Sequence, residues 1–284
     1  MSTLPHQVAL VSETKSIGFS EISTVAAALQ KQASRDFGPI WKVNATVDAF
    51  DKLESVPVDY WPIIVKDDIK EPGAAGYHTD ENGQPFSLVQ ADDGWALTAS
   101  HEALEMLADP FGNRTLAGSP PPNSPAPVSG FKRVVYLVEV CDPCEGTQFA
   151  YDVNGQELSD FITPHYYDPR GGASIQYSFR GSIMAPHTVL EGGYVSFGNP
   201  VTNQWYQIIV SNGKTELRDL GKLQRNGQSL RETIDLTVRK VLRDSHYRTQ
   251  KPGMAFAASA SASSPIAESS KARAESLRSF IKTL

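Results

Sequence analysis

Residues 95–110 read WALTASHEALEMLADP, and the structure expected for this stretch decides how the rest of the chain is interpreted. Alanines and leucines recur along one side of it, which is typical of a helix with an apolar face to bury. Thr98 and Ser100 are equally good residues to cap the start of that helix. Asp109 should end it, because a residue that precedes proline is pushed out of the helical region. We therefore expect a largely buried helix that carries charged side chains.

Three of those side chains form the pattern H-E-x-x-E. His101 and Glu105 lie four residues apart, so they project from one face of the helix and could hold one metal ion. Glu102 beside them could act as general base on a bound water. Glutamate is a harder ligand than imidazole, so the pattern fits zinc or another divalent cation. The same letters also arise by chance on a solvated acidic helix face.

A hydrolytic zinc site usually has three protein ligands, so a third must come from elsewhere in the chain. Glu139 is the first candidate, because an acid at the end of the apolar run 134–140 is costly to bury unless it is paired or binds a metal. Asp142 is the next candidate. Glu139 could instead form an ion pair with Arg133 or another cation.

Further side chains could serve the same centre. Asp109 could cap the end of the helix, or it could form a hydrogen bond to a side chain that binds the metal. Tyr166 or its neighbour Tyr167 could donate a hydrogen bond to a developing oxyanion. His78 and His165 are available as ligands, although a histidine in a loop, as expected for His78, is more often not one.

The remaining elements follow from periodicity and turn residues. Helices are expected at 22–33, after a capping box at Ser229 and Glu232, and at 277–284. Loops are expected at 73–85, with a turn at Asn82-Gly83, and at 111–130. Strands are expected at 7–11, 40–47, 60–65, 87–90, 134–140, 149–153, 157–161, 174–179, 194–197 and 204–210.

Composition narrows the class of protein. With 284 residues, 40% of them hydrophobic, the chain can bury a sizeable core. A formal net charge of -6 disfavours nucleic acid as a partner. No signal peptide and no apolar run of roughly 18 residues is evident, so we expect a soluble, cytoplasmic protein without membrane contact. Cys141 and Cys144 form a single C-x-x-C, which predicts buried thiols rather than a zinc knuckle.

At these motifs the chain resembles the zincin-type metallopeptidases. More narrowly, S-H-E-x-x-E-x-x-x-D-P at 100–110, followed by E-x-x-D at 139–142, is similar to a pattern of a group of bacterial metallopeptidases and of the plant EXORDIUM-like proteins. The resemblance covers about residues 95–145, and its fold analogy reaches about residue 215. It implies an α+β fold in which an active-site helix lies beneath a mixed sheet whose edge strand pairs with an extended substrate. It also implies His101 and Glu105 as ligands and Glu102 as base.

The expected organisation is a zincin-like domain at 1–215, ending in a β-rich subdomain, and a helical extension at 216–250. A flexible Ala/Ser linker at 251–270 and a terminal amphipathic helix at 271–284 follow. That helix could pack on its own domain or bind a protein partner. The expected function is a zinc-dependent peptidase acting on peptides or proteins. The alternative is an inactive zincin-like module, in which Glu105, Asp109, Glu139 and Asp142 bind a cation such as calcium or form an ion network, or which mediates assembly.

Overall fold

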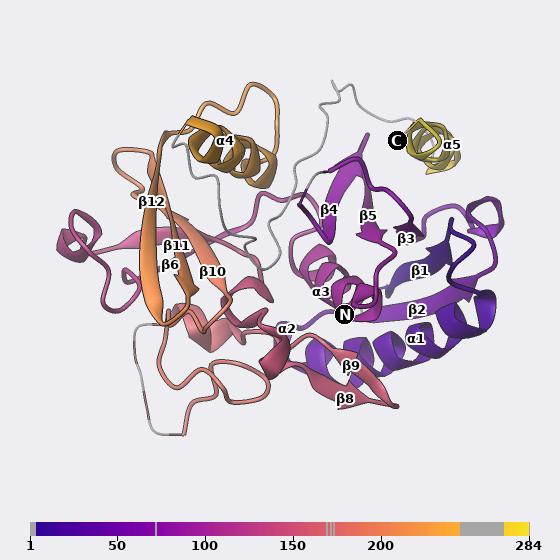
Figure 1. The fold of residues 1–284 in the computed structure, drawn as a ribbon, viewed down its shortest axis with the longest axis horizontal. Coiled ribbons are helices and arrows are strands. Elements are labelled where there is room, and N and C mark those ends of the chain that lie inside the picture. Colours follow the sequence, from indigo (N-terminus) through magenta and orange to yellow (C-terminus); the bar gives the residue numbers. More distant parts are fainter. Residues whose placement is uncertain are drawn as a thin grey trace. The chain divides into compact units, whose positions relative to one another are not determined.

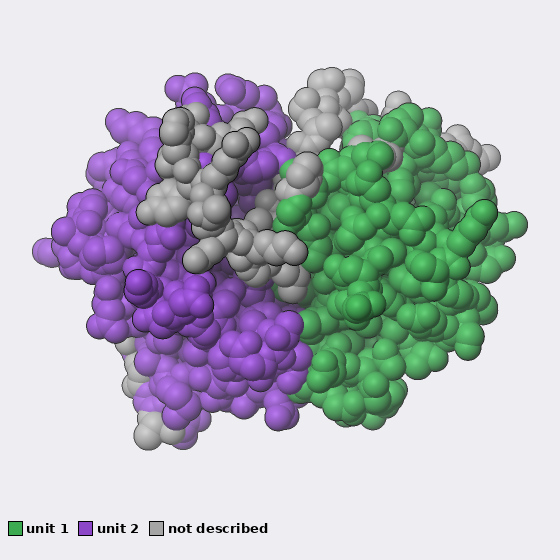
Figure 2. Space-filling model, in the orientation of Figure 1, with its two compact units in different colours: residues 1–111, 151–158, 254–284 green, residues 112–150, 159–253 purple. Residues whose placement is uncertain are grey.

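The computed structural model describes residues 4–71, 73–168, 170, 172, 174–244 and 270–283. The chain has an α+β fold and forms two compact units, coloured separately in Figure 2. Unit 1 comprises 1–111, 151–158 and 254–284, and unit 2 comprises 112–150 and 159–253. Each unit thus combines separate stretches of sequence, a division that differs from the expected boundary at residue 215. Within the described ranges, no helix is long and apolar enough to cross a membrane.

Unit 1 is built on a five-stranded mixed sheet with the order β2-β1-β3-β5-β4. Four of its strands run parallel, and β4 pairs antiparallel with β5 at the edge. The buried strands are rich in valine, isoleucine and leucine, as parallel strands covered on both faces require. Their bounds are β1 (His6–Ser12), β2 (Ala45–Phe50), β3 (Trp61–Lys66), β4 (Gly76–Glu81) and β5 (Gln84–Gln90).

Helices cover both faces of this sheet (Figure 1). The helices α1 (Phe19–Lys31) and α3 (Trp95–Ala108) contact each other and the strands on one face. The helix α5 (Ser270–Ile281) packs on the other, where Leu277 and Ile281 join a core cluster with Tyr77 of β4. Because successive strand residues point to opposite faces, the neighbour of Tyr77, His78, points toward α3.

The terminal amphipathic helix expected from the sequence is therefore present, and its apolar residues are used inside unit 1. Phe280 makes an edge-to-face contact with Phe86 of β5. The backbone oxygen of Ile281 accepts a hydrogen bond of 3.1 Å from Lys66. The expected linker at 251–270 lies outside the described residues except for its last position.

The segment expected to be a loop at 73–85 is mostly a strand, and this is the largest error of the sequence analysis in unit 1. Residues 76–81 form β4, joined to β5 by the tight turn at Asn82-Gly83. Both turn residues have positive φ, 53° at Asn82 and 77° at Gly83, as a two-residue hairpin turn requires. Polar residues such as His78 concealed the strand, because its alternation does not separate polar from apolar side chains.

Two other boundaries in unit 1 differ from expectation. The run 40–47 is not one strand, because the short helix α2 (Gly38–Trp41) takes its first residues and β2 begins at Ala45. The helix α3 begins at Trp95, with Gly94 as its N-cap, so Thr98 and Ser100 lie inside the helix instead of capping it. Asp109 follows the last helical residue, as predicted. The expected hairpin around Asn154-Gly155 forms β8 (Tyr151–Val153) and β9 (Gln156–Leu158).

Unit 2 is an antiparallel sheet with the order β12-β11-β10-β7-β6. The helix α4 (Leu230–Asp244) packs on it through Leu230 and Ile234, which share a cluster with Trp205. Ser229 and Glu232 form the predicted capping box, with reciprocal bonds of 2.9 and 3.1 Å. The strands are β6 (Thr115–Gly118), β7 (Val134–Leu137), β10 (Tyr194–Gly198), β11 (Gln204–Ser211) and β12 (Lys214–Lys222).

Three features of unit 2 differ from what the sequence predicts. The proline-rich segment 111–130 contains β6, which pairs with β7. The strand β7 ends at Leu137, so Glu139 lies beyond the strand and not at its end. Residues 174–179 form no strand and contribute only an isolated bridge from Ser178 to Ile162.

Candidate metal centre

The helix α3 places its three predicted site residues on a buried face. His101 is 2% exposed, and Glu102 and Glu105 are fully buried. An ordinary helix of this length would direct such side chains toward water, because burying a carboxylate costs several kcal/mol unless a cation or hydrogen bonds compensate it. The helix is thus built to hold its charges against the sheet and not in solvent.

Distances within unit 1 show that these side chains converge. Nε2 of His101 lies 3.2 Å from Oε1 of Glu105. The other carboxylate oxygen of Glu105, Oε2, lies 3.9 Å from Nδ1 of His78 on β4. Glu105 therefore stands between two histidines and offers one oxygen to each. Each histidine and Glu105 bring donor atoms within 4.8 Å of each other, close enough for them to share an ion.

His78 also binds the predicted general base. Its Nδ1 lies 3.2 Å from Oε2 of Glu102, and its Nε2 lies 3.2 Å from the backbone oxygen of Asp109. A carbonyl oxygen can only accept, so Nε2 is the ring nitrogen that carries a hydrogen there. From the sequence, His78 is expected in a loop and is not among the predicted site residues. The turn signal at Asn82-Gly83, with a strand on each side, could have placed it on a sheet edge.

A glycine allows β4 to approach α3 this closely. A Cβ at Gly76 would lie 2.6 Å from Cγ2 of Thr98 and 3.1 Å from Cγ of Glu102. The first distance is far below an ordinary carbon–carbon contact. Any larger residue at position 76 would push the strand away from the helix and would carry His78 with it.

A buried hydrogen-bond network fixes the other side of α3. Ser100 donates to Oε1 of Gln32 at 2.8 Å, and Nε2 of Gln32 donates to the hydroxyl of Tyr151 at 3.1 Å. Tyr151 in turn donates to Asp36 at 3.0 Å. Gln32 and Asp36 belong to a π-helical segment (Gln32–Phe37) that continues α1, a geometry often found near functional sites. This network sets the position of the residue just before His101.

The electrostatic effect of the buried carboxylates reaches Tyr77. Burial, together with the negative charge of Glu102, raises the pKa of Tyr77 to about 12. The phenol therefore stays neutral at physiological pH, and it cannot add a further negative charge beside the helix.

The predicted third ligands belong to unit 2. Oε2 of Glu139 lies 3.3 Å from Nη1 of Arg231, and both side chains are nearly buried. Glu139 thus has an ion-pair partner, as the alternative interpretation expected, but the partner is Arg231 and not Arg133. Asp142 begins a short 3-10 helix (Asp142–Cys144) and is 1% exposed. Cys141 and Cys144 are buried thiols, as predicted.

Tyr166, the predicted oxyanion donor, is fully buried in an aromatic cluster of unit 2. It contacts Tyr136, Tyr167 and His187 through their rings. Burial raises the pKa of Tyr166, and the nearby Cys144 and Asp142 add to the effect. The hydroxyl therefore keeps its proton, as a hydrogen-bond donor must, and it makes no hydrogen bond to any residue that the structure describes.

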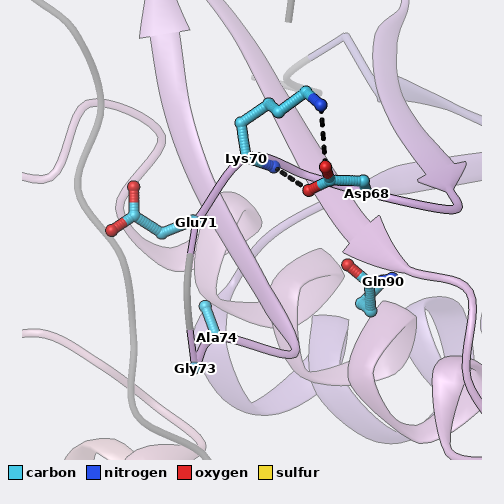
Figure 3. Close-up of a pocket in the computed structure, with 6 residues that line it drawn as sticks. All are labelled: Asp68, Lys70, Glu71, Gly73, Ala74 and Gln90. Carbon is cyan, nitrogen blue, oxygen red and sulfur yellow. Dashed lines mark hydrogen bonds and ion pairs between the residues drawn. The ribbon is translucent and has the colours of Figure 1, made fainter.

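A separate hollow of about 470 Å³ lies on unit 1 (Figure 3). It is lined by Asp68, Lys70, Glu71, Gly73, Ala74 and Gln90. None of these residues is among the histidines and glutamates that converge at α3, which are His78, His101, Glu102 and Glu105. Asp68 accepts two hydrogen bonds from Lys70, at 2.8 Å from the backbone and 2.7 Å from the side chain. The main charges of the hollow are therefore already paired with each other, and the cluster on α3 remains the stronger candidate site.

Comparison of the chain with protein-family models, with curated proteins and with solved structures gives no match. A function is therefore inferred from the geometry of the side chains around α3.

Proposed function

We propose that the protein is a zinc-dependent hydrolase of the peptidase class, with His101 and Glu105 as metal ligands and Glu102 as general base. The observation that carries the proposal is the distance of 3.2 Å between Nε2 of His101 and Oε1 of Glu105, on a buried helix face that also holds Glu102. Imidazole nitrogen and carboxylate oxygen are both common zinc donors. A set rich in carboxylates also accepts other divalent cations.

The fold of unit 1 supports this proposal. A helix carrying H-E-x-x-E follows the last parallel strand of a mixed sheet, and an antiparallel edge strand runs beside it. This is the arrangement that a zincin-like scaffold implies. In β4, the residues Gly76, His78 and Asp80 fall at the non-hydrogen-bonded positions opposite β5, counted from the two-residue turn. Their backbone groups thus point to the open edge, where an extended peptide could add as a further strand.

Zinc bound at this place would polarise a peptide carbonyl and lower the pKa of a water molecule. Glu102 would accept the proton of that water and pass it to the leaving amine. Its side chain is buried, and its Oε2 lies 3.2 Å from Nδ1 of His78. The role of Tyr166 as a donor to the oxyanion stays a prediction from the sequence.

Glu139 and Asp142 remain the candidates for a third ligand, as the sequence predicts. The ion pair between Glu139 and Arg231 already compensates the charge of Glu139, which weakens the original reason for preferring it. Comparing zinc content in Glu139→Gln and Asp142→Asn would distinguish the two, because each substitution removes a charge with little change of shape.

Metal analysis of the purified protein tests the proposal directly. We expect about one zinc per chain in the wild type, its loss in His101→Ala and Glu105→Ala, and its retention in His165→Ala, which changes an exposed histidine of unit 2. Glu102→Gln should keep zinc and lower the cleavage rate of a peptide library by roughly 10²–10⁴-fold, the usual contribution of a general base. A Glu102→Gln variant that cleaves as fast as the wild type would refute the mechanism.

The second candidate function is a non-catalytic module in which the same side chains stabilise the fold. The observation that favours it is their mutual pairing, His101 with Glu105 and His78 with Glu102. This alternative expects no cleavage of any peptide, whether or not a cation such as calcium binds. A protein partner for the terminal helix also remains a prediction, although Leu277 and Ile281 already pack inside unit 1.

A further inference from the structure

Glu105 stands between two histidines that come from different elements of unit 1. Its Oε1 lies 3.2 Å from Nε2 of His101 on the same helix, and its Oε2 lies 3.9 Å from Nδ1 of His78 on β4. Two ligands of one zinc ion lie at most about 4.4 Å apart, because each is about 2.0–2.2 Å from the metal. Both distances are short enough, so each oxygen of Glu105 can bind an ion together with a different histidine.

The two histidines do not converge on one point. Among the described residues, the potential ligand atoms that lie within 4.8 Å of one another fall into two groups, one with His78 and one with His101. Glu105 belongs to both groups. A single ion bound by both histidines would place them in the same group. The arrangement instead matches a carboxylate that bridges two ions, one at each of its oxygens.

The ring of His78 is oriented as in a histidine that binds a metal. Its Nε2 lies 3.2 Å from the backbone oxygen of Asp109, which can only accept a hydrogen bond. Its Nδ1 faces the carboxylates of Glu102 and Glu105, at 3.2 and 3.9 Å. Histidine ligands usually donate the hydrogen of their other ring nitrogen to a backbone carbonyl or a carboxylate, which fixes the ring. The bond to Asp109 thus leaves Nδ1 as the atom that can bind an ion.

An independent observation is a buried hydroxyl beside His78. Ser87 on β5 lies directly opposite His78 in the antiparallel pair, so both side chains lie on the face of the sheet toward α3. Its neighbours Phe86 and Leu88 join the core cluster on the other face. Ser87 is fully buried, yet its Oγ makes no hydrogen bond to any residue that the structure describes. Buried hydroxyls nearly always have a partner, and a water molecule bound to an ion at His78 would supply one.

We propose that a second divalent cation binds to Nδ1 of His78 and Oε2 of Glu105, and that Glu105 bridges it to the ion held by His101. The inference rests on the proposed function, which supplies the first ion. Nitrogen and oxygen donors together suit zinc, manganese or cobalt. Because the first ion repels the second, the second site should bind more weakly and fill only when metal is added. Pairs of ions about 3.5–4 Å apart serve several classes of hydrolase, aminopeptidases among them.

Zinc binding by the full chain measures the second site directly. In equilibrium dialysis against added zinc, the wild type should take up one further ion beyond the first. His78→Gln should keep the first ion and lose the second. Replacing a group that hydrogen-bonds to a metal ligand lowers affinity by about 10–100-fold, so loss of the ligand itself should weaken the second site at least as much. His6→Gln, at an exposed histidine of β1, is the matched control and should bind both ions.

The possible stoichiometries separate this inference from the proposed function. A wild type that takes up only one zinc in excess metal overturns the inference and leaves the proposed function intact. So does a His78→Gln variant that binds the second zinc as tightly as the wild type. Loss of both ions from His78→Gln also overturns it, because His78 would then serve the first ion. A wild type that binds no zinc refutes the proposed function.

Electron paramagnetic resonance of the wild type loaded with Mn²⁺ needs no variant and tests the bridge itself. Two Mn²⁺ ions that share one carboxylate couple magnetically, so the signal per ion should fall as the second equivalent binds. The control His6→Gln should show the same fall. Signals of the two equivalents that simply add would show that the ions lie apart, and the inference would be wrong.

Discussion

The close approach of β4 to α3 makes Gly76→Ala the most informative single change in the protein. The new methyl group would lie 2.6 Å from Cγ2 of Thr98 and 3.1 Å from Cγ of Glu102. Overpacking of a tight interior typically costs about 1–3 kcal/mol. Replacing glycine also stabilises by about 0.4–1 kcal/mol, because the unfolded chain loses freedom. The net loss of unfolding free energy should thus be about 1–2 kcal/mol.

A second substitution identifies the contact responsible. Thr98→Ser removes Cγ2, the atom nearest to the added methyl group, and leaves the hydroxyl in place. In the Gly76→Ala background it should recover about 1 kcal/mol, whereas alone it should destabilise slightly by losing a buried methyl group. Urea unfolding followed by tryptophan fluorescence, with Trp95 on α3 among the reporters, measures the unfolding free energy of the wild type, the two single variants and the double variant.

The same cycle has a functional readout. Displacement of β4 moves His78 away from Glu105, so Gly76→Ala should also weaken binding of the second cation, and Thr98→Ser should restore part of it. A Gly76→Ala variant as stable as the wild type would refute the reasoning. So would a double mutant in which Thr98→Ser recovers nothing, because the clash would then lie elsewhere.

Three further predictions concern other parts of the molecule. Tyr151→Phe should cost about 1–3 kcal/mol of unfolding free energy, because it removes two buried hydrogen bonds of the α3 network, whereas Tyr60→Phe, at an exposed hydrogen bond, should cost less in the same urea titration. Burial raises the pKa of Asp160 to about 6, so its contribution to stability is fully present below its unfolded pKa near 4 and is lost as pH rises through 6. Unit 2 should therefore gain about 2–3 kcal/mol between pH 7 and pH 4 from this group, and Asp160→Asn should remove that part of the pH dependence of unfolding. Leu277→Ala should cost about 2–4 kcal/mol and lower the thermal midpoint, while Ser279→Ala on the exposed side of α5 should not; equal effects would show that α5 does not pack on the sheet as described.

Local sequence patterns predicted the helix of the candidate site, the start of α4 and two hairpin turns. The spacing of His101 and Glu105 placed both on one helix face, because the helical period is a property of the backbone alone. The end of α3 at Asp109 and the capping box of α4 were also predictable, since each depends on residues within one turn. The hairpin signals at Asn82-Gly83 and Asn154-Gly155 likewise mark real turns.

Segments whose structure depends on distant partners were predicted poorly. The strand β4 exists because it pairs with β5 and packs on α3, although its own residues are mostly polar. The strand β6 exists because it pairs with β7, although prolines surround it. Thr98 and Ser100 look like caps in the sequence, yet both are buried inside α3, because Ser100 finds a hydrogen-bond partner in Gln32.

The sequence by itself therefore determined that a helix carries His101, Glu102 and Glu105, and how the three are placed on it, because those relations are set within a few residues by backbone geometry. Only the tertiary structure decided that His78 reaches Glu102 from a strand 24 positions earlier, and that Arg231 is the partner of Glu139. Such pairings depend on how whole elements pack, and side-chain contacts between elements leave no periodic trace in the sequence.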